Sequence, residues 1–289
     1  MRKCIIIPIK HSSSRVPGKN YRDFNGEPLM KIVLNTIIQS KSLDTIVIDT
    51  NSDTVKSILK DYNDERIIVY DRPEHLWDGN TPTNVLLENV IQDLNLDHEI
   101  ILQTHVTNPL LTLETIDKCI AQFVEKEKDG YDSLFTVKQL QTRLYTLENE
   151  KVNALNHNPN ELLPTQDLEP LYEENSCLYI FKREVLFNKH HRIGYKPFMF
   201  VMDDIESSDI DTETDFILAE TLHKELVLNK DSKGRVVLVT GASRGIGLEI
   251  CKKFHKQKWT VVGVARSSDF SDPSIDTYIS KDLTSPNSA

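Results

Sequence analysis

The feature that most constrains this chain is a series of short apolar runs that are continuous rather than alternating. The first run is Cys4–Ile9, and similar runs follow at Thr45–Asp49, Ile67–Tyr70, Glu99–Gln103 and Ser133–Val137. A strand of a parallel sheet has this composition because helices cover both of its faces. Segments with helical periodicity separate the runs, at Pro28–Ser40, Thr54–Tyr62, Thr83–Leu94 and Leu113–Lys126. The alternation predicts an α/β fold with a mainly parallel sheet.

This alternation is interrupted between residues 138 and 175, which are rich in asparagine and proline. We interpret the segment as an excursion from the sheet and as an arm that contacts a partner chain. A strand at Cys177–Phe181 and a helix at Thr214–Leu226 then complete a first domain, residues 1–228. Residues 229–235, NKDSKGR, fit neither periodicity and are predicted to form a linker.

A second unit occupies residues 236–289. It contains a strand, a glycine-rich turn, a helix and a second strand, at Val236–Thr240, Gly241–Gly247, Ile246–Gln257 and Thr260–Ala265. This order predicts a partial βαβ segment of the dinucleotide-binding kind.

Charge and composition exclude several classes of function. The chain has 34 Lys and Arg against 44 Asp and Glu, a net charge of −10, so sequence-independent binding to nucleic acid is not expected. No stretch has the roughly 20 apolar residues that cross a bilayer, and Pro8 follows too early for a signal peptide. We therefore expect a cytoplasmic protein without membrane contact. The four cysteines lack metal-ligand spacing and are interpreted as buried thiols.

The segment after the first strand, KHSSSRVPGKN at residues 10–20, predicts a polyphosphate site. It combines three hydroxyls and a Pro-Gly turn with the cations Lys10, Arg15 and Lys19. Ligands of open α/β sheets bind at the carboxyl ends of strands, where this segment lies. It matches neither GxxxxGK[ST] nor GxGxxG, and a solvated basic loop is the alternative.

Several motifs in the same order resemble the acylneuraminate cytidylyltransferases over residues 1–228. The shared elements of the opening stretch are Pro8, Ser13, Pro17, Gly18, Lys19, Asn20, Gly26 and Pro28. Further on they are Arg72-Pro73, Asn108-Pro109-Leu110, Gln166-Asp167-Leu168 with Asn175, and Asp209-Ile210-Asp211-Thr212-Glu213. The resemblance implies a Rossmann-like nucleotidyltransferase that uses CTP.

The resemblance also implies roles for the residues of the opening stretch. Lys19 and Ser13 would contact the CTP phosphates, while Asn20 and Arg72 would help to hold the cytidine. Lys10, which stands where the family usually has arginine, and Arg15 complete the nucleotide-binding set. A lysine at position 10 keeps the charge but loses the bidentate fork of arginine.

Asp209 and Asp211 are two residues apart in a stretch read as extended, which places both carboxylates on one face. Such a pair suits Mg²⁺, which combines a few carboxylates with substrate phosphates. Capping of the following helix, by Asp211 or Thr212 with Asp215, is the alternative. The family resemblance places metal-binding aspartates here, so we assign Asp209 and Asp211 to Mg²⁺ and, with Lys19, to catalysis.

The acceptor side departs from the family pattern. Glu173 stands where typical members have an arginine, Thr165 replaces the arginine before QDL, and His105 replaces a glutamine. A carboxylate at 173 would repel the carboxylate of a sialic acid, unless the loop alignment is shifted by a residue or two. The candidate acceptor-binding residues are His105, Arg143 in the arm, Glu173 and Asn175.

The second unit, with RVVLVTGASRGIG, resembles the beginning of the short-chain dehydrogenase/reductases. The matching residues are Gly241, Ser243, Arg244, Gly245, Ile246 and Gly247. Arg244 and Arg266 would favour the 2′-phosphate of NADPH, and Asp282 lies in a segment resembling the adenine contact. The catalytic Tyr-x-x-x-Lys of that family is absent. We expect a piece of a longer bifunctional protein that uses NADPH only at full length; a vestigial βαβ is the alternative.

Together these features predict a CTP- and Mg²⁺-dependent cytidylyltransferase that releases pyrophosphate. The fused reductase segment favours a ketose phosphate acceptor, later reduced to a CDP-alditol for surface (capsular) polysaccharide. The alternatives are a CMP-nonulosonic acid synthetase and a non-catalytic nucleotide-binding module. The 138–175 arm is expected to form a homodimer.

Overall fold

The computed structural model describes residues 1–228, 235–268, 270–282 and 284. The chain divides into two compact units, Met1–Ala219 and Glu220–Ala289, and each is described on its own. Residues 229–234 of the predicted linker lie outside the described residues.

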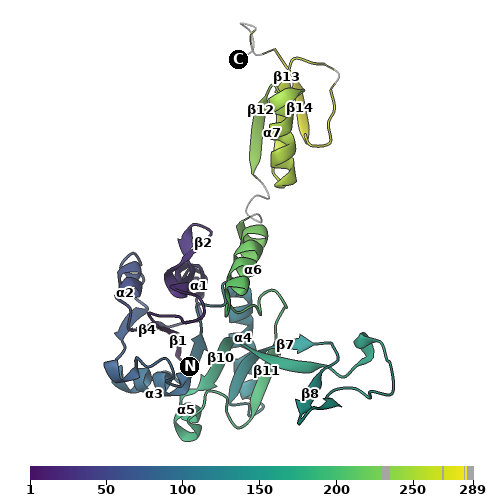
Figure 1. Ribbon diagram of the computed structural model, residues 1–289. Coiled ribbons are helices and arrows are strands. Elements are labelled where there is room, and N and C mark those ends of the chain that lie inside the picture. Colours follow the sequence, from purple (N-terminus) through teal and green to yellow (C-terminus); the bar gives the residue numbers. More distant parts are fainter. Residues whose placement is uncertain (229–234, 269, 283, 285–289) are drawn as a thin grey trace. The chain divides into compact units, whose positions relative to one another are not determined.

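A seven-stranded sheet forms the centre of the first unit (Figure 1). Its order is β11 (Pro197–Val201), β7 (Ser133–Leu140), β10 (Leu171–Lys182), β6 (Ile100–Thr104), β1 (Lys3–Ile9), β4 (Thr45–Thr50) and β5 (Ile67–Asp71). All neighbouring pairs are parallel except those of β10, which runs antiparallel to both β6 and β7. The predicted α/β fold with a mainly parallel sheet is confirmed.

Helices cover both faces of this sheet. They are α1 (Leu29–Ile37), α2 (Asp53–Leu59), α3 (Thr83–Asp93), α4 (Leu113–Glu127) and α5 (Arg183–Lys189). A further helix, α6 (Glu213–His223), packs against Val16, Phe24 and Leu29 and is followed by a π-helical turn at Lys224–Leu228. Within β1, Ile5 and Ile7 pack into the cluster that contains residues of α1, α2 and α4. Cys4 and Ile6 pack into the cluster with α3 and α5. Both faces of β1 are therefore buried, which is why its apolar run is continuous.

Only residues 141–170 of the predicted excursion leave the sheet, and they contain a two-stranded hairpin. Residues 138–140 and 171–175 belong to β7 and β10 instead, because the two strands pair with each other there. The strands of the hairpin are β8 (Tyr145–Glu148) and β9 (Lys151–Ala154). The two turn residues, Asn149 and Glu150, have φ of 49° and 66°, which is the left-handed geometry of a tight hairpin. A second small hairpin joins β2 (Asp23–Phe24) to β3 (Glu27–Pro28).

The second unit contains a three-stranded parallel sheet and one helix. The elements are β12 (Val236–Thr240), α7 (Gly245–Lys256), β13 (Thr260–Ala265) and β14 (Thr277–Ser280). A Cβ atom on Gly247 would lie 2.2 Å from the carbonyl oxygen of Gly241, so this tight turn requires glycine. Among the residues described, no helix is long and apolar enough to span a bilayer. All four cysteines are buried and free, as predicted.

Candidate functional site

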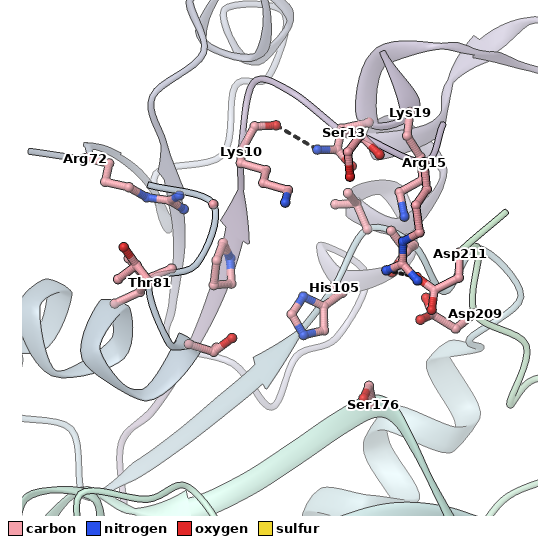
Figure 2. Close-up of a pocket in the computed structure, with 18 of the residues that line it drawn as sticks. Lys10, Ser13, Arg15, Lys19, Arg72, Thr81, His105, Ser176, Asp209 and Asp211 are labelled. Carbon is pink, nitrogen blue, oxygen red and sulfur yellow. Dashed lines mark hydrogen bonds and ion pairs between the residues drawn. The ribbon is translucent and has the colours of Figure 1, made fainter. Parts of the chain in front are cut away.

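A cleft of about 420 Å³ lies where the chain leaves β1, β5 and β6 (Figure 2). It contains every residue predicted to bind the nucleotide or the metal. These residues are Lys10, Ser13, Arg15, Lys19, Asn20, Arg72, Asp209 and Asp211. The carboxyl ends of parallel strands gather side chains that are far apart in sequence, which explains their convergence.

The basic turn after β1, residues 10–20, is folded back on itself. The side-chain amide of Asn20 donates to the carbonyl of Lys10 at 2.8 Å, and Ser13 Oγ accepts from the N–H of Val16 at 3.3 Å. Gly18 has φ of 64°, a left-handed conformation that glycine adopts without strain. These contacts give the turn a defined shape and hold its cations at the cleft.

The basic turn touches the acidic segment that precedes α6. Arg15 forms a 2.7 Å ion pair with Asp211, and Lys19 Nζ donates to the carbonyl of Ile210. Burial lowers the pKa of Lys19, and the nearby charges of Asp209 and Asp211 oppose this shift. The basic turn and the Asp209–Asp211 segment, which are far apart in the sequence, are therefore in direct contact in the structure.

The acidic pair is not used to cap α6. Thr212 Oγ1 accepts from the N–H of Asp215 at 3.3 Å, and Asp215 Oδ2 accepts from the N–H of Thr212 at 2.7 Å. This reciprocal arrangement satisfies the start of the helix. The carboxylates of Asp209 and Asp211 therefore remain in the cleft, where Figure 2 shows them close to Arg15.

The chemistry of the pair fits a hard divalent cation. Burial raises the pKa of Asp209, and its buried Oδ1 has no hydrogen-bond partner within the described part of the chain. Such an orphaned acceptor is costly unless a ligand completes it. The described residues hold no group of three or more His, Cys, Asp or Glu side chains arranged for a metal. Two carboxylates suit Mg²⁺ that shares its remaining positions with phosphates and water.

Arg72 is fixed by a buried ion pair with Asp49. Its Nε and Nη2 atoms donate to the two carboxylate oxygens at 2.9 and 2.8 Å, and the side chains are only 5% and 1% exposed. A bidentate pair sets the plane of the guanidinium. The sequence analysis did not identify Asp49, because it lies in a strand that reads as core.

The four residues predicted to bind the acceptor do not form one cluster within the chain. His105 lines the cleft, as does Ser176, which was not predicted. Arg143 donates to the carbonyl of Leu163 within the arm. Glu173 is an exposed residue of β10, paired in register with Lys138. Asn175 is buried and bonds to Thr136 and Cys177.

A cation that the sequence analysis missed, Arg192, lies close enough to His105 for its charge to lower the pKa of that ring. The guanidinium of Arg192 stacks 3.6 Å from the centre of the Tyr179 ring, and its Nη2 lies 3.8 Å from Glu174 Oε1. Tyr179 in turn donates to Glu174. Arg192 lies in a connecting segment with no motif, so only its position in the fold reveals it.

Comparison with known proteins assigns the first unit. The family model described as "Cytidylyltransferase" matches residues 4–235, which is most of the chain. The chain belongs to the cytidylyltransferase family. The resemblance predicted from the sequence is therefore confirmed, and with it the assignment to the nucleotidyltransferases.

Two relatives are each named after a particular acid. A pseudaminic acid cytidylyltransferase from Campylobacter jejuni is 23% identical over 78% of this chain and 97% of its own length. A CMP-N,N′-diacetyllegionaminic acid synthase from Legionella pneumophila is 27% identical over 77% of this chain and 96% of its own length. The structure of CMP:2-keto-3-deoxy-manno-octonic acid synthetase complexed with CTP aligns with a TM-score of 0.56 at 14% identity. The aligned region is 78% of this chain and 99% of the synthetase chain, which supports a shared fold.

A second family model, described as "short chain dehydrogenase", matches residues 235–274. Within this unit a cavity of about 720 Å³ lies beside the glycine-rich turn. Of the predicted dinucleotide residues it is lined by Gly241, Ser243, Arg244, Arg266 and Asp282. Gly245, Ile246 and Gly247 belong to the start of α7 and do not line it. Lys281, which was not predicted, adds a third cation to the lining.

Proposed function

We propose that the first unit transfers the cytidylyl group of CTP to a sugar acceptor with release of pyrophosphate. One observation carries the proposal: the contact between the basic turn and the Asp209–Asp211 segment. This contact places Arg15 and Lys19, which could bind a triphosphate, in the same cleft as two carboxylates that could bind a metal ion. Arg72, at the end of the cleft formed after β5, would hold the cytidine.

The roles of the residues follow from the charges. Lys10, Arg15 and Lys19 would bind the triphosphate, and the 2.7 Å pair of Arg15 with Asp211 would open as each group takes a new partner. Asp209 and Asp211 would hold Mg²⁺, which when bound neutralises charge on the departing pyrophosphate. The acceptor oxygen would attack the α-phosphorus in line, so no covalent enzyme intermediate is required.

For the acceptor we propose a nonulosonic acid. The names of the two relatives favour it, and Arg192 supplies a positive charge near an acceptor half that lacks the expected arginine at position 173. A ketose phosphate, giving a CDP-sugar for later reduction, is the second candidate. Its supporting observation is the match of residues 235–274 to the short-chain dehydrogenases.

Pyrophosphate release from CTP and Mg²⁺ tests the function directly, with nonulosonic acids and ketose phosphates as parallel acceptors. We expect Asp211→Ala to lower the rate at least ~100-fold, because the cleft loses one of the two carboxylates that would hold Mg²⁺. The control Asp61→Asn changes an exposed carboxylate elsewhere on the unit and should leave the rate unchanged. CTP binding without pyrophosphate release from any acceptor would identify a nucleotide-binding module instead.

We further propose that the arm, residues 138–175, mediates a homodimer. Leu147 and Val152 face each other across the β8–β9 hairpin and are 72% and 64% exposed. Leaving this apolar surface in contact with water forgoes the free energy of burying it, and contiguous exposed apolar surface marks an interface. Leu162, elsewhere in the arm, is a further apolar residue with 90% exposure.

Sedimentation equilibrium checks this proposal. The wild type should have twice the chain mass of 33.2 kDa. The double variant Leu147→Lys/Val152→Glu should sediment as a monomer, because opposite charges keep the cross-strand pair but remove the apolar contact. A variant that remains dimeric would place the interface elsewhere.

Reduction is expected only at full length, but we propose that the second unit already binds the adenosine 2′-phosphate of NADPH. Arg244, Arg266 and Lys281 line its cavity and give it a positive charge. Asp282 Oδ1 accepts from both the N–H and the hydroxyl of Thr284, at 3.0 and 2.7 Å, which fixes its carboxylate at the cavity.

Fluorescence titration with NADPH and with NADH measures how much the 2′-phosphate contributes to binding, because the two cofactors differ only in that group. Arg266→Ala should weaken NADPH binding about 10-fold, as expected for the loss of a charge-assisted contact, and leave NADH binding unchanged. Equal binding of the two cofactors by the wild type would contradict a 2′-phosphate site.

A further inference from the structure

We propose that Arg192 and Gln103 hold His105 in a single neutral tautomer, with the proton on Nδ1, and that this N–H donates to an oxygen of the sugar acceptor. The inference rests on the proposed transferase function for its second half only. His105 would then be a binding residue, and Arg192 and Gln103 would be positioning residues.

Two hydrogen-bond partners fix the orientation of the Gln103 side-chain amide. Arg192 Nη1 lies 2.5 Å from Gln103 Oε1, and a guanidinium only donates hydrogen bonds. The oxygen of the amide must therefore face Arg192. Independently, Gln103 Nε2 donates to the carbonyl of Thr104 at 3.1 Å. Two separate partners thus fix which end of the amide is nitrogen.

The fixed amide of Gln103 in turn determines which ring nitrogen of His105 carries the proton. The same Gln103 Nε2 lies 2.9 Å from His105 Nε2. An amide nitrogen is a donor without acceptor capacity, so His105 Nε2 must be the unprotonated acceptor. In a neutral imidazole the proton then resides on Nδ1. The ring lines the cleft, and Figure 2 shows it pointing into that space.

The surrounding charges favour the neutral ring. Burial and the positive charges of Arg192 and Lys19 lower the pKa of His105 to about 4. Glu174 on β10 interacts with Arg192 and with Tyr179. The ring is therefore neutral at physiological pH. Its Nδ1 already carries the proton and cannot accept another. It serves to bind an oxygen and does not act as a general base.

The position of His105 in the sheet identifies the ligand. Arg72 follows β5, the basic turn follows β1, and His105 follows β6, with Ser176 on the neighbouring β10. Along the sheet order β10-β6-β1-β4-β5, the phosphates would lie over β1 and the base toward β5. The space at β6 and β10 is left for the acceptor.

Nitrogen-15 NMR of histidine-labelled protein without substrates tests the tautomer, with His105→Gln identifying the signal among nine histidines. We expect Nδ1 protonated and Nε2 unprotonated at pH 7. Gln103→Glu should reverse this pattern or charge the ring, because a carboxylate only accepts. The control Gln92→Glu makes the same charge change on an exposed site of α3 and should leave the signal unaltered. An Nε2-protonated or cationic ring in the wild type would overturn the assignment.

Kinetics tests the contact with the acceptor. His105→Leu should raise the KM for the acceptor about 3- to 10-fold with the KM for CTP unchanged, as expected for one neutral hydrogen bond. His105→Gln, which keeps an N–H donor, should recover most of the loss. Equal effects on both substrates would contradict acceptor binding. The expected NMR pattern in a wild type without transferase activity would refute the function while leaving the tautomer established.

Discussion

The site depends on the contact between Lys19 and the backbone of Ile210, which joins segments 191 residues apart. Burying an ammonium group is unfavourable, and the lowered pKa of Lys19 reflects that cost. The carboxylates of Asp209 and Asp211 offset it by placing negative charge nearby. Because the same carboxylates face the cleft, this contact also brings together the charges that we propose bind a metal-bound triphosphate.

Most of the fold could be predicted from periodicity, for a physical reason. Strands such as β1 are buried on both faces and therefore read as continuous apolar runs. The edge strand β11 alternates between exposed and partly buried residues and was missed. The charged half of β10 was missed as well, because residues such as Glu173 become a strand by pairing with β7 and not by local preference.

The convergence of the residues proposed to bind the nucleotide and the metal was predictable because all of them except Arg72 lie in two short motifs. The surroundings of the proposed acceptor site were not predictable, since single residues from several segments form them. Asp49 looked like part of a core strand, and Arg192 lies in a segment without a motif. Their importance comes from what they hold: Asp49 fixes Arg72, and Arg192 orients Gln103, which in turn orients His105. Such relayed contacts leave no local pattern in a sequence.

A crystal structure with CTP and Mn²⁺ in place of Mg²⁺ would test the central claim most directly, because manganese scatters anomalously. The account predicts an anomalous peak bonded to Asp209, Asp211 and phosphate oxygens, with the triphosphate against residues 10–20. A nucleotide bound in this cleft with the metal away from both carboxylates would contradict it.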